Sequence, residues 1–136
     1  MTVKFSGKLV GVHSTEIVHG PSGSVIKTTP PTDNGGDGSC FSPTDLFASS
    51  LGACSVSIMA MYIHKNHFPV EGIRFDLEKE MSSTLPRRIS KLTVNFYIKT
   101  TCSEEDFKRI VNAGKTCPVR HSLSKEIEVI ENYIRE

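Results

Sequence analysis

Apolar and polar residues alternate along two long stretches in the second half of the chain. Residues 71–81 and 92–98 place hydrophobic side chains at almost every second position, with charged or polar residues between them. This period of two is typical of β-strands that bury one face and expose the other. The pattern predicts two long antiparallel strands that are joined near residues 82–87.

The N-terminal residues 1–29 carry the same kind of alternation, with Phe5 and Leu9 at odd positions and polar residues between them. The sequence Gly-Pro-Ser-Gly at residues 20–23 has proline at the second position of a turn, which predicts a hairpin there. A last strand is predicted over residues 126–134.

A long helix is predicted to begin at Ser42. Ser42 can cap it, Pro43 suits the first helical position, and Asp45 can reach back to the cap. No side chain is charged in residues 46–63, which would span about 27 Å as a helix. That length is close to a membrane span, but four serines and a glycine interrupt the run. A helix that is apolar on every side is expected to be buried on every side, under a sheet and another helix or subunit.

Two shorter helices complete the expected elements. One covers residues 103–114 and has acidic residues in its first turn, and another begins at Cys117-Pro118. The loop at residues 30–42 is rich in proline and glycine, so no regular structure is expected in it. Strands, a long helix, two strands, two helices and a strand predict an α+β fold, and the length fits a single domain over residues 1–136.

Charge and composition exclude several classes of protein. The 136 residues include 16 lysines and arginines and 15 acidic residues, so the net charge is +1, without the basic excess of a typical nucleic-acid-binding protein. The hydrophobic fraction is 38%, and it rises to about 45% when the 10 glycines are counted, which is at the low edge of globular composition. Subunit association could therefore supply part of the burial. The first residues lack the apolar segment of a signal peptide, which predicts a cytoplasmic protein with reduced thiols.

The chain has four cysteines and no Cys-x-x-Cys pair, which argues against a zinc knuckle and against a thioredoxin-type site. Cys117 stands at the expected start of a helix, where its sulfur would face unpaired backbone N–H groups. Cys54 lies in the middle of the uncharged helix. Two cysteines in such different settings suit a pair in which one attacks an oxidant and the other closes a disulfide. The roles of Cys40 and Cys102 stay open.

Two segments of the chain carry a family resemblance. Residues 42–54, which run from Ser-Pro-Thr-Asp-Leu-Phe to Ser-Leu-Gly-Ala-Cys, resemble the signature helix of the OsmC/Ohr family of osmotically induced and organic hydroperoxide resistance proteins. Residues 117–123, Cys-Pro-Val-Arg-His-Ser-Leu, resemble the Cys-Pro-Val/Ile-Ser-x-x-Leu element of that family. The separation of 63 residues between the two motif cysteines also agrees with the family.

The resemblance implies an OsmC-like fold, in which antiparallel sheets pack around a long buried central helix, in an intertwined homodimer with two sites at the subunit interface. It implies a thiol-dependent peroxidase of organic hydroperoxides, with Cys54 as the peroxidatic residue and Cys117 as the resolving residue. The implied reductant is a dithiol, typically lipoyl-bearing. The resemblance implies no bound cofactor and no metal, and no nucleic-acid or membrane partner is expected.

The sequence departs from the family at two positions. Well-studied members pair the reactive cysteine with an arginine from the N-terminal half and a glutamate just after the proline that opens the helix. The first arginine here is Arg74, and Thr44 occupies the glutamate position, with Asp45 beside it. His13, Lys27 and Asp45 are candidate substitutes. Without a nearby arginine, the peroxidatic cysteine is expected to keep a pKa near or above that of free cysteine.

Two other functions stay open. One is a non-catalytic OsmC-like dimer that binds an apolar acyl or aromatic ligand, and the other is a metal or thiol sensor. His64 and His67 are three residues apart, and Cys117 and His121 are four apart, so either pair could contribute to a metal site. The missing arginine favours the binding protein, whereas the two cysteine motifs favour the peroxidase.

Overall fold

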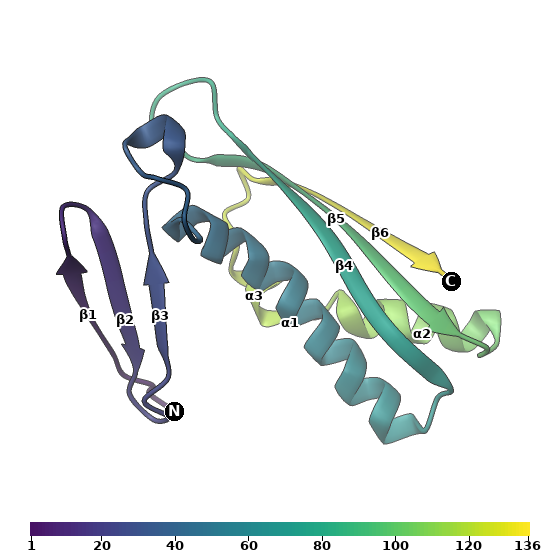
Figure 1. Ribbon diagram of the computed structural model, residues 1–136. Coiled ribbons are helices and arrows are strands. Elements are labelled where there is room, and N and C mark those ends of the chain that lie inside the picture. Colours follow the sequence, from purple (N-terminus) through teal and green to yellow (C-terminus); the bar gives the residue numbers. More distant parts are fainter. The chain divides into compact units, whose positions relative to one another are not determined.

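The computed structural model describes residues 1–136 as two compact units, Met1–Phe47 and Ala48–Glu136 (Figure 1). The first unit holds three strands, a short 3₁₀ turn and the start of the long helix α1. The second unit holds the rest of α1, three strands and two further helices. The elements are β1 (Phe5–Val10), β2 (Ser14–His19), β3 (Val25–Thr28), η1 (Thr32–Asn34), α1 (Pro43–Asn66), β4 (Val70–Met81), β5 (Ile89–Thr100), α2 (Glu104–Gly114), α3 (Pro118–Ser122) and β6 (Glu128–Arg135).

Strands β1, β2 and β3 form an antiparallel sheet in that order. The hairpin predicted at residues 20–23 is confirmed, because it joins β2 to β3. Gly23 donates its N–H to the carbonyl of His19 at 2.8 Å, and the positive φ of 73° at Gly23 suits a glycine. The sequence analysis missed the first hairpin, which turns at Gly11 with a φ of 68°.

Several large apolar side chains of the first unit are exposed in the single chain. Every residue of β1 is exposed, and so are most residues of β3. The exposed apolar residues of β1, β3 and the turn after β1 are Phe5, Leu9, Val10, Val12, Val25 and Ile26. Apolar surface of this extent marks an interaction surface in a folded protein.

The start of α1 is fixed by the cap that the sequence predicts. Ser42 donates its N–H to Asp45 Oδ2 at 2.9 Å, and Asp45 donates its own N–H to Ser42 Oγ at 3.1 Å. These two bonds form a capping box. The preceding loop contains η1, although the sequence analysis expected no regular structure there.

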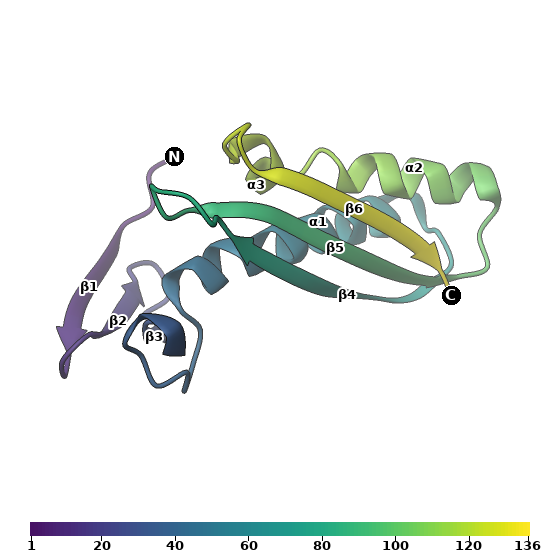
Figure 2. The ribbon, with the colours of Figure 1, turned by 90° about the horizontal axis from the view of Figure 1, so that it is seen from above.

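The second sheet has the strand order β4-β5-β6, and α1 and α2 lie on the same face of it (Figures 1 and 2). Strands β4 and β5 pair antiparallel, as predicted, but β6 runs parallel to β5. The expectation of purely antiparallel sheets is therefore wrong for this strand. A parallel pair needs a crossover connection, and α2 and α3 provide it.

The core of this unit lies between β5 and the helices. Leu92, Val94, Phe96 and Ile98 of β5 are fully buried. They belong to one hydrophobic cluster with residues of α1 and of α2, including Leu51, Met59 and Ile110. The core therefore fixes where each helix lies on the sheet, including the middle of α1, which carries Cys54.

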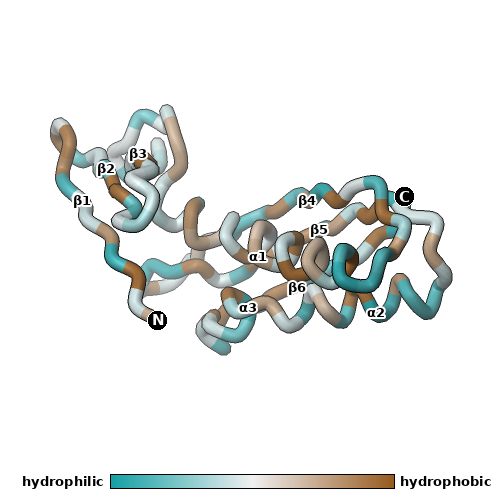
Figure 3. The backbone as a smooth tube through the Cα atoms, turned by 90° about the horizontal axis from the view of Figure 1, so that it is seen from below, coloured by the Kyte–Doolittle hydropathy of each residue, from teal (hydrophilic) through white to brown (hydrophobic).

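Helix α1 is buried along one side only in the single chain. The buried residues are Ala48, Leu51, Gly52, Ser55 and Met59. Met61 is 61% exposed, so the expectation of burial on every side is not met within one chain. One sheet and α2 can cover only one side of a helix this long. In Figure 3 much of α2 is coloured as strongly hydrophilic, whereas residues 46–63 of α1 carry no charged side chain.

By length and composition, α1 is also the one helix of the chain that could cross a membrane. The central helix of a folded domain passes the same test. The side of α1 that faces the sheet packs into the hydrophobic cluster just described.

Gly52 allows α1 to approach β4 closely, since a Cβ at this position would overlap the ring of Phe75. We expect Gly52→Ala to lower the free energy of unfolding by about 1–3 kcal/mol, the usual cost of overpacking a core. Urea unfolding at fixed protein concentration measures this loss. Gly72→Ala on β4 is the matched control, because a Cβ there meets nothing within 4 Å. Equal stability of the two variants would contradict this account of the packing.

Candidate functional site

The two cysteines of the sequence motifs lie together in the second unit. Cys54 is half-buried in the middle of α1, and Cys117 is fully buried just before α3. Cys117 belongs to the hydrophobic cluster against which Cys54 packs, it is near enough to raise the pKa of the Cys54 thiol, and both cysteines are free thiols. The fold thus brings together two thiols that are 63 residues apart in the sequence.

Cys117 caps α3, as its position before Pro118 predicts. Its sulfur accepts a hydrogen bond from the backbone N–H of Arg120 at 3.4 Å. The side chain therefore satisfies one of the N–H groups that a helix start leaves unpaired. This cap fixes the direction of the Cys117 side chain in the core.

The surroundings of Cys54 raise the pKa of its thiol. Burial is the largest cause, because it disfavours the charged thiolate, and the hydrogen bond with Cys117 adds to it. The backbone N–H of Val119 opposes this by donating a hydrogen bond to the Cys54 sulfur. The direction agrees with the expectation for a reactive cysteine that has no arginine beside it.

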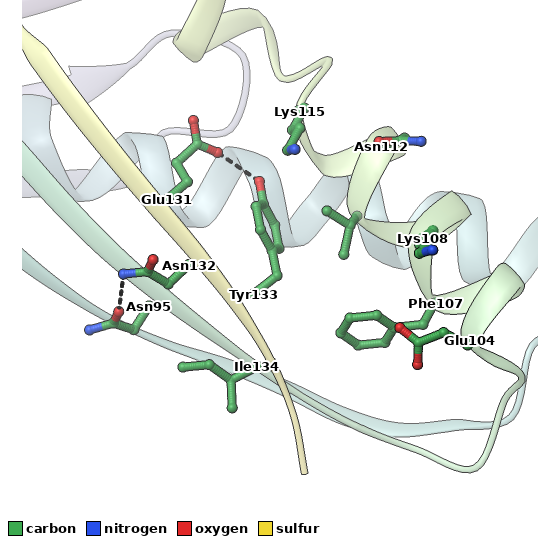
Figure 4. Close-up of a pocket in the computed structure, with 11 residues that line it drawn as sticks. Asn95, Glu104, Phe107, Lys108, Asn112, Lys115, Glu131, Asn132, Tyr133 and Ile134 are labelled. Carbon is green, nitrogen blue, oxygen red and sulfur yellow. Dashed lines mark hydrogen bonds between the residues drawn. The ribbon is translucent and has the colours of Figure 1, made fainter.

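Helix α3 therefore supplies a backbone N–H to each sulfur, and a polar network ties α3 to β6. The Arg120 Nε lies 2.5 Å from Glu131 Oε1, and the Tyr133 hydroxyl donates to Glu131 Oε2 at 2.6 Å (Figure 4). The Glu131 side chain is only 9% exposed. The Tyr133 ring stacks on Phe96 with the ring centroids 4.9 Å apart.

Burial and the neighbouring Glu131 carboxylate raise the pKa of Tyr133, so its hydroxyl stays protonated and keeps its place as a donor. The sequence analysis missed this network. One signal was available, because Glu131 and Tyr133 are two residues apart on a predicted strand and therefore share a face.

The other predicted site residues lie in the first unit. Thr44 and Asp45 open α1, where the Thr44 hydroxyl is 3.2 Å from that of Ser42. His13 lies in the turn after β1, and Lys27 lies on β3, and both are exposed. A role of these four residues in supporting Cys54 stays a prediction.

The remaining cysteines and histidines lie away from the thiol pair. Cys40 is exposed in the loop before α1, and Cys102 is buried where β5 leads into α2. His64 and His67 line a different pocket, at the end of α1. No group of three or more histidine, cysteine or acidic side chains is arranged to hold a metal ion.

Comparisons with known proteins agree on the fold. A sequence profile of the OsmC-like protein family matches residues 36–132. A structure from Psychrobacter arcticus, described as an osmotic stress induced and detoxification response protein, has a TM-score of 0.84 and 29% identity over 100% of this chain and 96% of that chain.

Two organic hydroperoxide resistance proteins share the fold at lower identity. The protein from Elizabethkingia anophelis has a TM-score of 0.76 and 14% identity, over 100% of this chain and 97% of its own. The protein from Legionella pneumophila has a TM-score of 0.74 and 18% identity, over 98% of this chain and 97% of its own. No match was found among curated proteins.

The raised pKa of Cys54 predicts slow alkylation at neutral pH. Since the thiolate is the nucleophile, the rate should rise with pH and reach its midpoint above the pKa of free cysteine, about 8.5. Iodoacetamide labelling of the Cys54 peptide, followed by mass spectrometry, measures this midpoint. Cys117→Ala should lower it, because the variant removes the hydrogen bond that helps to raise the pKa. Cys40→Ala is the control and should leave it unchanged. A wild-type midpoint well below that of free cysteine would mean that a cation supports Cys54.

Proposed function

Because the chain belongs to the OsmC-like protein family, we propose that it is a thiol-dependent peroxidase, which reduces organic hydroperoxides through Cys54 and Cys117. The observation that carries the proposal is that the fold packs the two motif cysteines, which are distant in the sequence, at one hydrophobic cluster, with Cys117 inside it and Cys54 against it. Two relatives of the same fold are described as organic hydroperoxide resistance proteins, which supports the choice of oxidant. We place the protein in the cytoplasm, where thiols are kept reduced.

The chemistry needs two sulfur atoms and no bound cofactor. The Cys54 thiolate attacks the terminal oxygen of the hydroperoxide, the O–O bond breaks, and the alkoxide takes up a proton and leaves as an alcohol. Cys54 then carries a sulfenic acid. The Cys117 sulfur attacks the Cys54 sulfur, an S–S bond forms, and the sulfenic oxygen leaves as water. A dithiol, lipoyl-bearing by family resemblance, reduces this disulfide and is itself oxidised.

The packing around Cys54 suits an organic oxidant better than hydrogen peroxide. Cys54 packs against the hydrophobic cluster, as do its helix neighbours Val56 and Ile58. Apolar side chains favour the contact of an alkyl or aryl group over that of water. Val119 donates the hydrogen bond that would stabilise the thiolate during attack.

We further propose that the protein is a homodimer. Apolar residues of β1 and β3 and one side of α1 are exposed in the single chain, and a second subunit would bury them. An interface of this composition resembles a domain core divided between two chains, as in obligate dimers.

A ligand-binding protein without peroxidase activity is the second candidate. The raised pKa of Cys54 favours it, because a thiol that stays protonated is a poor nucleophile. The two functions differ in one result, since only a peroxidase consumes hydroperoxide when the pH is raised above the pKa of Cys54.

Intact mass after one equivalent of cumene hydroperoxide tests the thiol pair. The wild-type chain should lose two hydrogen atoms, because Cys54 and Cys117 form a disulfide. Neither Cys54→Ser nor Cys117→Ser should show this loss, whereas Cys40→Ser should behave like the wild type. A disulfide that forms without Cys117 would contradict its role as the resolving residue.

Light scattering at micromolar concentration tests the dimer and should give twice the mass of the chain. Leu9→Asp should shift the protein toward the monomer, because it places a charge among exposed apolar side chains of β1. Lys8→Gln, at the neighbouring exposed position, should leave the mass unchanged. A wild-type monomer at this concentration would overturn the proposed interface.

A further inference from the structure

A groove with an apolar floor runs between α2 and β6, with a volume of about 740 Å³ (Figure 4). The side chains of Phe107 and Tyr133 point into it from opposite walls, and Val111 adds to the apolar surface, whereas Ile134 lies on the other side of β6. Lys108 and Lys115 stand along the α2 side. The volume falls within the range of small-molecule sites, about 300–1,000 Å³.

One end of the groove is positively charged. A second hollow of about 400 Å³ shares Lys115 and Glu131 with the groove and adds Arg120 and His121. Glu131 is the one acidic residue lining this hollow, and its two carboxylate oxygens are already engaged by Arg120 and Tyr133. The basic side chains therefore outnumber the acidic ones, and the single carboxylate has no oxygen without a partner.

Arg120 is held in a direction that leaves its terminal nitrogens available. Its Nε bonds to Glu131, and neither terminal nitrogen makes a hydrogen bond within the chain. Lys115 forms no ion pair, and its Nζ lies 5.8 Å from the centre of the Tyr133 ring. An oriented guanidinium with two free N–H₂ groups matches the two oxygens of a carboxylate.

The opposite end of the groove has no such excess of charge. Glu104 lies there and pairs with Arg135, with 3.6 Å between the charged atoms. From Glu104 to Lys115 the wall is α2, which at the usual helical rise spans about 16 Å. The groove therefore has one basic end, an apolar floor and the length of a medium-chain acyl group.

We propose that this groove binds a medium-chain carboxylate, with the carboxylate on Arg120 and Lys115 and the alkyl chain over Phe107, Val111 and Tyr133. The site is separate from the half-buried face of Cys54, and it does not depend on peroxidase activity. It adjoins the thiol pair, because the backbone N–H of Arg120 bonds to the Cys117 sulfur.

Calorimetric titration of the full-length protein with sodium dodecanoate, below its micelle concentration, tests the site. One dodecanoate should bind per chain, and dodecanol should bind at least tenfold more weakly. Arg120→Gln should weaken dodecanoate binding on the order of 10- to 100-fold, the usual effect of losing a charged hydrogen bond. Lys125→Gln removes the same charge at an exposed lysine outside the groove and should bind like the wild type.

A second variant tests the alkyl chain. Val111 is only part-buried on α2, so Val111→Ser should fold and should weaken dodecanoate binding while dodecanoate still binds more tightly than dodecanol. Equal binding of dodecanoate and dodecanol would overturn the proposal. So would equal weakening by Arg120→Gln and Lys125→Gln, or the absence of any binding to the wild-type protein. Each of these results leaves the peroxidase proposal standing, because none of them measures the reaction of Cys54.

Discussion

The placement of the Cys54 and Cys117 thiols beside each other depends on the packing of α1, α3 and β6 in the second unit. Cys54 is placed by α1, which the cluster around Leu51 and Met59 fixes on the sheet. Cys117 is placed by its cap on α3. The bond between Arg120 and Glu131 then ties α3 to β6. In the proposed mechanism these two sulfur atoms form one covalent bond, which tolerates little displacement, so the close packing at Gly52 and the buried network at Glu131 would serve the same requirement.

The surroundings of Cys54 also determine the pH at which its thiol ionises. Burial and the neighbouring thiol raise the pKa of Cys54, and a backbone N–H is the group that opposes them. A thiolate without a charged partner is costly in an apolar setting, so the ionised form is a minor one at neutral pH. A cation brought by the other unit, by a second subunit or by a ligand would change this balance. The basic residues beside α3 lie on the side of the groove, not at the Cys54 sulfur.

Local patterns in the sequence predicted most elements, but they did not predict how those elements meet. The Ser42–Asp45 cap and the strands at residues 71–81 and 92–98 follow from spacing alone, since caps and strand periodicity involve near neighbours. The parallel direction of β6 cannot be predicted from spacing, because the alternation of apolar and polar residues is the same whichever way a strand runs. The network at Glu131 depends on α3 folding back over β6, which no local pattern encodes. The apolar surface of α1 indicated burial but not which chain provides it.

The central claim is that Cys54 is the residue that meets the hydroperoxide, and trapping its sulfenic acid tests this most directly. Cys117→Ser should be treated with cumene hydroperoxide in the presence of dimedone at a pH above that of the Cys54 midpoint, and the adduct located by peptide mass spectrometry. The account predicts one dimedone adduct, on the peptide that carries Cys54, and none in Cys54→Ser. An adduct on Cys117 in Cys54→Ser, with none on Cys54 in Cys117→Ser, would contradict it and reverse the two roles.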